Sequence, residues 1–588
     1  MRSHAASRAT PSTPTETPLS RASRGLATVL LLCGAAALSA CIGDIGSGDE
    51  NNVGPGNSGG DPGGSGGPGG GVTPSGIQIS PTSQLPRLTK VQWENTVKDL
   101  FDLPAVTGLS VSFAPDPLGG KAFENNQSAL DVTPQLWSDY QVAAEAVAEL
   151  VTGDATLMGK LPGGGDATKL VEELATRAFR RPLVADEATA LKAVFDKGAE
   201  LYPEQDAFAA GARMLIQALL QSPHFVYRAE LATTDAGDGL VALSSYEVAS
   251  RLSFGLWNSM PDAALFDAAA SGQLDTQEGL EAQVDRLLES TRAKETMRVF
   301  FDELYEAEQY ENLNKSPTKY VDWDPALGAQ MRMELSKFVS HIVFDLKGGA
   351  REVLTSTTTF VTPELAAIYG IPDSSLDQPD EDGYYQVELD PKERSGLLTR
   401  LGFLAWKGTE TQPDSILRGV FMNRKIICQH LGDPPDAAMG AKLGDEKTNR
   451  EKVEALTGEG TCGASCHGTF INPAGFALEH YGAIGEWRAE DNGEAIDSSS
   501  TFPFEDGDQS YKDAVEWSKV LADSPQVHRC YSGFWVEYLM GRSKDEKRDD
   551  ALIEKLAEVS ETGSTLDVVR ALLVSDAIRY RLAAQEEP

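Results

Sequence analysis

One short segment combines the residue types needed to hold a redox cofactor. The run Cys462-Gly463-Ala464-Ser465-Cys466-His467 has two thiols, and a histidine directly follows the second. In an exported protein this arrangement predicts covalent c-type haem, because the two thiols can add to the vinyl groups while the imidazole of His467 reaches the iron. The usual motif has two residues between the cysteines. With three, the first thiol is turned by about 100° on a helix, so the local backbone must adjust.

Two other arrangements of these residues stay open. Cysteines four apart in a helical turn are roughly 6 Å apart, near the upper end of the disulfide range, so Cys462 and Cys466 can also form a disulfide. Zinc is the third alternative, with Cys462, Cys466, His467 and a further histidine as ligands. The sequence alone does not choose among the three.

A haem would also need a sixth ligand. Four candidates lie near or downstream of the motif, and they are Met439, His480, His528 and Met540. We predict Met540, because a haem methionine usually follows its Cys-His pair, and so His467 and Met540 form the expected metal-ligand pair. The alternative for Met540 is a core position beside Tyr538 and Leu539.

The N-terminus predicts that this chemistry takes place outside the cytoplasm. Residues 1–40 carry four arginines and one glutamate, and their apolar run from 25 to 40 is shorter than the roughly 20 residues of a membrane span, as in a signal peptide. The tetrad Leu38-Ser39-Ala40-Cys41 resembles the bacterial lipobox, which implies a lipid on Cys41 and a membrane anchor in the cell envelope. Ile42 after the cysteine favours the outer membrane. An ordinary secretory signal, with Cys41 as a free thiol, is the alternative.

Composition restricts what the mature chain can bind. Residues 41–82 are rich in glycine, serine and proline, which predicts a flexible tether. The formal charge of the chain is −37, and the signal contributes +3, so the mature part carries −40. Such a charge repels phosphate backbones, and we therefore expect no nucleic-acid partner. The expected partners are a membrane, through the lipid, and an envelope redox protein or another envelope protein.

The remaining two cysteines are expected to pair. Thiols seldom stay free outside the cytoplasm, and either haem or a local disulfide at Cys462 and Cys466 leaves only Cys428 and Cys530 for each other. This bond would join a helix over 416–430 to the C-terminal helical region. It would close a loop of about 100 residues and stabilise the fold by about 4 to 5 kcal/mol in the chain-entropy model.

Hydrophobic periodicity predicts a mainly helical body. Thr89 and Gln92 have capping-box spacing, and Thr133-Pro134 supplies an N-cap followed by proline at the first helical position. Further helical patterns cover 170–179, 208–221, 245–256, 278–288, 293–304, 331–346, 416–430, 513–521 and 553–573. The best strand signal is Asp491-Asn492-Gly493, a turn between 485–488 and 494–497. The predicted fold class is mainly α, a multidomain helical body with a small, irregular, cytochrome-like or disulfide-stapled C-terminal region.

Several motifs resemble the PSD and PSCyt series of uncharacterised domains found in planctomycetes and myxobacteria, the domains of unknown function 1587, 1595, 1592, 1588 and 1585. The segments that carry the resemblance are 88–100, Ala178-Phe179-Arg180-Arg181-Pro182-Leu183, 221–228, 249–257 with 261–262, 360–370, 394–399, 466–467, 472–479, 487–488, 541–542 and 574–576. The resemblance implies domains at 83–152, 166–232, 240–372, 390–498 with the cysteine motif, and 505–582, after the signal at 1–40 and the tether at 41–82. It implies no activity.

Two functions from different classes remain. No G-x-S-x-G, H-E-x-x-H or Walker signature is present, so the expectation is an electron-transfer protein or subunit rather than a free-standing enzyme. The first function is a haem-bearing envelope lipoprotein. The second is a disulfide-stapled binding or scaffold lipoprotein without a redox cofactor. Arg180, Arg181 and Arg251 could clamp a carboxylate, although buried arginine bridges between helices are commoner.

Overall fold

The structure is a computed structural model that describes residues 71–116, 121–432, 444–461 and 463–583. Helices form most of these residues, and the strands occur in small sheets of two or three. The mainly α prediction is therefore confirmed. The predicted signal peptide, Cys41, Met439 and Cys462 lie outside the described residues.

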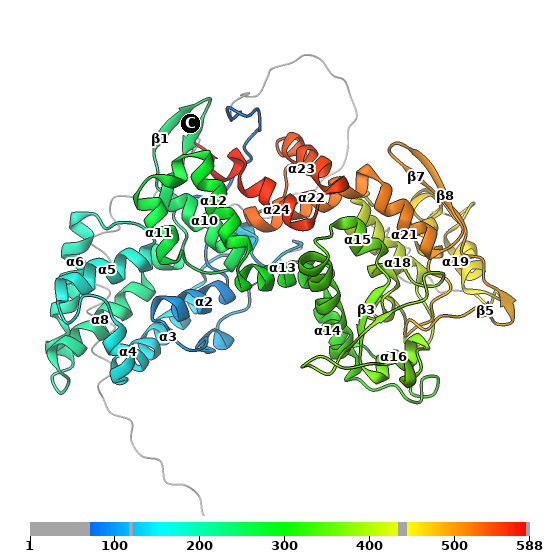
Figure 1. Ribbon diagram of the computed structural model, residues 1–588, viewed down its shortest axis with the longest axis horizontal. Helices are drawn as coiled ribbons and strands as arrows, with labels where there is room; N and C mark the ends of the chain where they lie inside the picture. The colour runs from blue at the N-terminus through cyan, green and yellow to red at the C-terminus, as the bar shows by residue number, and fades with distance from the viewer. Residues whose placement is uncertain (1–70, 117–120, 433–443, 462, 584–588) are drawn as a thin grey trace, which may run out of the picture. The chain divides into compact units, whose positions relative to one another are not determined.

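The N-terminal helices form one group around a common core. α3 packs along α8, and the two lie side by side in Figure 1. Thr89 caps α2 with the expected capping box, and Thr133 caps α3 with Pro134 at its first position, so both predicted helix starts are confirmed. The helices of this group are α2 Lys90–Leu100, α3 Pro134–Gly153, α4 Ala155–Lys160, α5 Ala167–Phe179, α6 Ala185–Asp196, α7 Gly198–Leu201, α8 Ala207–Gln221 and α9 Pro223–Val226.

The central part of the chain alternates helices with two short sheets. Its helices are α10 Ser245–Trp257, α11 Ala263–Ala270, α12 Gln277–Leu288, α13 Thr291–Leu304, α14 Leu327–Ser340, α15 Ala350–Thr355 and α16 Pro363–Tyr369. Its strands are β1 Thr234–Gly237, β2 Leu240–Ala242, β3 Thr358–Val361 and β4 Tyr385–Glu388. β3 and β4 pair with each other, whereas β1 and β2 are joined by a third strand, β9 Tyr580–Leu582, from the C-terminal end.

The region around the cysteine motif has shorter elements. They are α17 Leu401–Trp406, α18 Ser415–Phe421, α19 Asn449–Thr457, α20 Asn472–Phe476, β5 Glu490–Asp491 and β6 Glu494–Ala495. β5 and β6 pair across Asn492 and Gly493, which both have positive φ as a type I′ turn requires. The predicted hairpin is present, but its first strand is Glu490–Asp491 and not 485–488.

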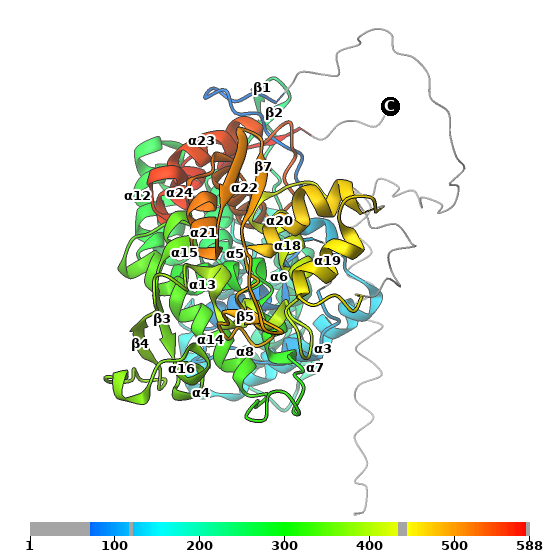
Figure 2. The same cartoon turned by 90° about the vertical axis from the view of Figure 1, so that its right-hand side faces the viewer.

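The C-terminal elements pack on the central helices. They are β7 Ser500–Phe504, β8 Gly507–Tyr511, α21 Ala514–Asp523, α22 Pro525–Met540, α23 Asp550–Thr562 and α24 Thr565–Leu573. α22 and α24 both contact α23, and the three lie together in Figure 2. The ring of Trp535 on α22 stacks on Phe300 of α13, with 3.5 Å between the centroids. The single helix predicted over 553–573 is two helices, because Ser564 caps α24 after a break at Gly563.

Two hydrophobic cores underlie this arrangement. The helices between 88 and 226 share one core, and residues from 240 to 578 share the other. Residues 71–82, at the end of the predicted tether, belong to the folded part. Ile77 and Ile79 are buried in the second core, and Ser80 donates a 2.8 Å hydrogen bond to Asp549. The tether therefore ends before residue 82, because the side chains of Ile77 and Ile79 are buried in the second core.

Two predicted helices end in a wider turn. The helix expected over 331–346 is α14 followed by a π-helical turn, His341–Asp345, and the helix expected over 416–430 is α18 followed by a π-helical turn, Met422–Ile427. Among the described residues, no helix has both the length and the apolar content that a membrane crossing requires.

Candidate functional site

Cys466 and His467 lie in a third π-helical segment, Ala464–Ile471, which runs directly into α20. The Cys466 thiol is exposed, whereas His467 is half-buried. The other thiol of the motif, Cys462, lies outside the described residues. Haem attachment, a local disulfide and a zinc site therefore all stay predictions.

The imidazole of His467 has an unsatisfied ring nitrogen. Its Nδ1 is buried and has no hydrogen-bond partner among the described residues. Burial lowers the pKa of His467, and the side chain of Asn472 only partly opposes this shift. The ring is therefore mainly neutral at pH 7, which is the form that binds a metal ion.

Asparagine side chains hold the C-terminal end of the segment. Asn423 donates through Nδ2 to the carbonyl of Phe470 at 3.0 Å, and Asn472 donates to Thr457 of α19 at 2.9 Å. The backbone of the segment also lies very close to α18. A Cβ on Gly419 would lie 2.1 Å from the carbonyl oxygen of Ile471, so only glycine fits there. Cys466 and His467 are thus presented from a fixed frame.

A buried polar network lies next to this frame. Glu479 accepts hydrogen bonds from Ser415 and, at 2.9 Å, from Asn449. The backbone of Asn449 donates to Asp491 at 2.7 Å, and Asp491 pairs with Arg488 at 2.8 Å. Burial raises the pKa of Glu479, while its two hydrogen bonds and Arg488 lower it. The network joins the start of α18, the start of α19 and the β5–β6 hairpin.

Buried Arg418 contributes to positioning rather than to binding. Its guanidinium donates to the carbonyls of Leu404, Lys407, Leu478, Tyr481 and Gly482. Arg394 has a similar role, because it lies between the rings of Tyr369 and Tyr481, 4.8 Å from each centroid. The hydrogen-bond donors of the Arg418 guanidinium are thus occupied by protein carbonyls.

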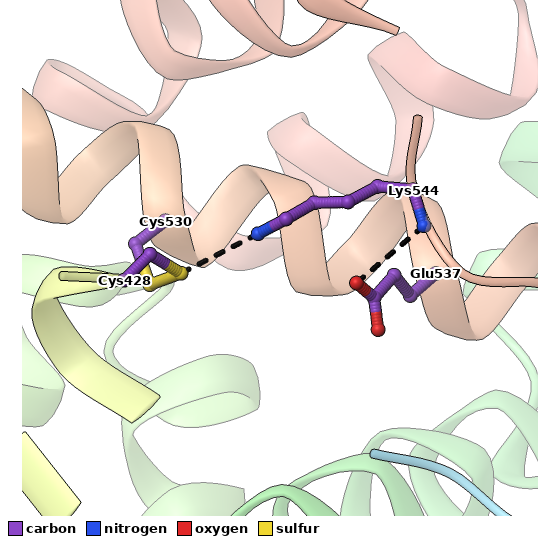
Figure 3. Close-up of a disulfide and its surroundings, with 4 residues drawn as sticks. All are labelled: Cys428, Cys530, Glu537 and Lys544. Atoms are coloured by element: carbon purple, nitrogen blue, oxygen red, sulfur yellow. Dashed lines mark hydrogen bonds between the residues drawn. A yellow bond between two sulfur atoms is a disulfide. The ribbon is translucent and has the colours of Figure 1, made fainter. Parts of the chain in front are cut away.

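The predicted disulfide is confirmed. Cys428, directly after the Met422–Ile427 turn, is bonded to Cys530 of α22, with Cα atoms 5.3 Å apart and 102 positions between them in the chain (Figure 3). Cys530 is almost completely buried. The bond attaches the segment that follows α18 to the long C-terminal helix, as the sequence predicted.

Met540 lines a cavity to which His467 does not contribute. It ends α22 and lines this small cavity with Thr82, Gln127 and Ile578, and the described residues Cys466 and His467 are not among the lining residues. Its role as a haem ligand stays a prediction.

The two described histidine candidates have other contacts. His480 stacks on Trp487 and bonds through Nδ1 to the carbonyl of Arg488 at 2.9 Å. Both ring nitrogens of His528 are used, by Ser560 at 2.9 Å and the carbonyl of Ala522 at 3.0 Å. Within the described part of the chain, no group of three or more His, Cys, Asp or Glu side chains is placed to hold a metal ion.

Sequence reasoning did not find a cavity of about 310 Å³ that lies between the N-terminal helices, α13 and α22. Glu303 lines it and accepts a 3.0 Å hydrogen bond from the backbone of Glu124. Burial, reinforced by Glu124 and Asp302, raises the pKa of Glu303 to about 8. No local sequence signal marks this cavity, because distant segments form it.

A second unpredicted feature is a more open cleft of about 860 Å³. Asp99 and Arg292 form a bidentate ion pair on its wall, with both contacts at 2.7 Å. Its size is within the range of small-molecule sites. Here too, the lining residues come from separate parts of the sequence.

The fold and site together define a mainly helical chain in which a disulfide joins the cysteine-motif region to the C-terminal helices. Comparison with family models shows that the chain carries domains of the PSD and PSCyt series, each described as a protein of unknown function. In chain order they are PSD3 (DUF1587) at 87–153, PSD5 (DUF1595) at 166–230, PSD4 (DUF1592) at 243–371 and PSCyt3 (DUF1588) at 394–491. The resemblance of the C-terminal segment to a fifth domain stays a prediction. No curated protein and no solved structure matches the chain.

Proposed function

We propose that this protein is an envelope lipoprotein that carries a covalent c-type haem on Cys462, Cys466 and His467 and uses it for electron transfer. The observation that carries the proposal is the exposed thiol of Cys466 directly before the half-buried, neutral imidazole of His467. The abbreviation in PSCyt3, the model that matches this region, also supports a cytochrome-like domain.

The residues present suit this group. Attachment adds the S–H of each thiol across one vinyl double bond, which forms two thioethers without net oxidation. When bound, the haem supplies a one-electron couple between an envelope donor and an envelope acceptor. The exposed Cys466 is accessible to attachment, and His467 is already in the neutral form that can act as a ligand. Asn423 and Asn472 hold the segment in place.

Export and anchoring are part of the proposal. Disulfides form and persist mainly outside the cytoplasm, so the Cys428–Cys530 bond supports an exported chain. A lipid on Cys41, followed by the glycine-rich tether, would let the folded part reach its partners from the membrane, which we propose is the outer membrane. In cells that express the full chain, Cys41→Ser should release the protein from the membrane fraction. Retention of this variant would contradict the anchor.

The second candidate is a disulfide-stapled binding or scaffold lipoprotein without a redox cofactor. The observation in its favour is the Cys428–Cys530 bond itself. A compartment that oxidises this pair would also oxidise Cys462 and Cys466, provided that haem attachment does not consume them first.

The deciding experiment is expression of the full chain with the cytochrome c maturation machinery, followed by denaturation. The first function predicts a haem that stays with the polypeptide and gives a reduced pyridine-haem spectrum. Cys466→Ser should weaken that spectrum, and His467→Ala should abolish it. The control is His430→Ala, at an exposed histidine outside the motif, which should leave the spectrum unchanged.

Mass spectrometry of the peptide with Cys462 and Cys466 separates the outcomes. An added haem mass supports electron transfer. A loss of two hydrogen masses supports the scaffold, and a wild-type chain without haem under these conditions contradicts the first function.

A further inference from the structure

Arg228 is partly buried, and its guanidinium has no hydrogen-bond acceptor among the described residues. The residue follows α9, and its backbone N–H donates to the carbonyl of Pro86 at 2.8 Å. Its side chain lies over the ring of Phe254, 5.4 Å from the centroid. Its Nε is buried and unpaired, and the guanidinium makes no hydrogen bond or ion pair among the described residues. The nearby carboxylate of Glu230 partly compensates the charge of Arg228, but it is bound to Arg251, so Arg228 has no hydrogen-bonded negative partner of its own.

The neighbouring arginines differ from Arg228 in this respect. Arg251 binds Glu230 through two contacts, at 2.6 and 2.8 Å, and also donates to three backbone carbonyls. Arg180 donates to four carbonyls, and Arg181 pairs with Glu187 at 2.7 Å. Arg180 is buried and Arg181 and Arg251 are partly exposed, but all three are bound to protein groups, as in the bridges that the sequence suggested as the alternative to a carboxylate clamp. Arg228 remains available.

The Arg228 side chain lines a small, partly open space. Arg228 lines a cavity of about 50 Å³ together with Ser250 and the three other arginines. A second cavity, of about 20 Å³, also includes Arg228, and it is lined by Thr82, whose buried hydroxyl has no partner. A single water needs roughly 10 to 15 Å³ by this measure, so the larger space holds either several waters or one small oxyanion.

The charge around the cavity favours an anion. Four arginines line it against two glutamates, Glu230 and Glu247, in a chain whose formal charge is −37. Glu230 is used by Arg251, and Glu247 accepts from the backbone of Ala232 and from Ser244. Burial lowers the pKa of Arg228 to about 10; Glu230 opposes this shift and Arg251 adds to it, so the side chain is still a cation at neutral pH.

We propose that Arg228 forms a partly buried binding site for a small oxyanion, either inorganic phosphate or sulfate or the carboxylate of a small acid. The planar fork of a guanidinium matches two oxygens of such an anion, and the Ser250 hydroxyl supplies a further donor. The site lies where segments matched by PSD5 and PSD4 meet, close to the start of the PSD3 match at 87. A bound oxyanion would therefore link these three parts of the chain.

The test is titration of the purified full chain with sodium phosphate, sulfate, acetate or chloride at constant ionic strength, followed by calorimetry and by the unfolding midpoint Tm. At an oxyanion concentration about 100-fold above Kd, we expect Tm to rise by about 2 to 3 °C. Arg228→Gln should weaken binding by about tenfold or more, since it removes charge-assisted hydrogen bonds. Arg228→Lys keeps the charge without the fork and should have an intermediate Kd.

Arg424→Gln is the matched control, because it removes the same charge from an exposed position, and it should bind like the wild type. Tighter binding of phosphate and sulfate assigns a tetrahedral anion, and tighter binding of acetate assigns a carboxylate. Three results would contradict the site: a Tm rise with chloride equal to that with the oxyanions, oxyanion binding by Arg228→Gln as tight as that of the wild type, or the absence of saturable binding. A stability loss in Arg228→Gln that is the same with and without oxyanion would show a structural bridge instead.

Discussion

Nζ of Lys544 donates a hydrogen bond to Sγ of Cys428, 3.4 Å away, so a cation lies directly beside the disulfide (Figure 3). The same ammonium group lies over the ring of Phe534, 5.3 Å from its centroid. A cation next to a sulfur atom stabilises a thiolate there and attracts an attacking thiolate. The lysine therefore favours reduction of the bond.

Lys544→Met should slow the reduction of this disulfide by dithiothreitol. A charge contact at a partly exposed site is worth up to about 1 kcal/mol, which predicts a rate about two- to fivefold lower. The rate is measured by trapping the released thiols at intervals and counting them by mass spectrometry. Lys547→Met is the control, because Lys547 is exposed in the same loop. Equal rates for the two variants would contradict a role for Lys544.

Removal of the disulfide should destabilise the fold. The bond closes a loop of 102 positions, for which the chain-entropy model gives about 4 to 5 kcal/mol. We expect the double variant Cys428→Ala/Cys530→Ala to unfold at a Tm several degrees below the wild type under non-reducing conditions. Cys466→Ser, in protein produced without haem, is the control at an exposed thiol. A double variant that melts with the wild type would show that the bond contributes little.

Glu303 should make the stability of the chain depend on pH. Burial raises its folded-state pKa to about 8, so the folded chain holds a proton there that the unfolded chain releases near its ordinary value of 4.5. Its contribution to stability is therefore fully present below about pH 4.5 and is lost as pH rises toward 8, by up to about 1.4 kcal/mol per pH unit.

Glu303→Gln removes this dependence. Its Tm relative to the wild type should rise between pH 5 and pH 9, because the amide stays neutral throughout. Glu289→Gln changes an exposed glutamate at the end of α12 and should give a Tm difference that is flat with pH. A flat difference for Glu303→Gln as well would mean that Glu303 is ionised in the folded protein at neutral pH.

The sequence predicted those features that depend on local chemistry. Thr89 and Thr133 cap their helices through contacts within four residues, and Asn492-Gly493 forms its turn by itself. The Cys428–Cys530 pair followed from the number of cysteines and the expected compartment. Each of these inferences needs only short-range geometry or counting.

Features that depend on distant contacts were missed. Most of α22 is buried, on more than one face, so its sequence has no polar stripe to reveal a helical period. Arg228 lies in a quoted motif, yet its lack of an acceptor becomes visible only when α9, α10 and residues 82–86 meet. The turn after α18 depends on Asn423, which bonds both Gly419 and the distant Phe470.

Glu479 should be the residue on which the frame of the Cys466–His467 segment depends most. Glu479→Ala leaves the Ser415 hydroxyl without its acceptor, removes one of the two acceptors of Asn449, and removes a carboxylate 3.6 Å from Arg488. Loss of one partner of a buried charged network costs about 3 to 5 kcal/mol, whereas Glu479→Gln keeps an acceptor oxygen and should cost about 1 to 2 kcal/mol.

The loss should be local as well as global, because Asn449 begins α19 and Thr457 at its end holds Asn472. Hydrogen exchange followed by mass spectrometry should therefore show faster exchange over 449–472 in Glu479→Ala than in Glu479→Gln. Glu490→Ala, at an exposed position of β5, is the control and should exchange like the wild type. If exchange rises evenly over the whole chain, the network contributes general stability and does not specifically position Cys466 and His467.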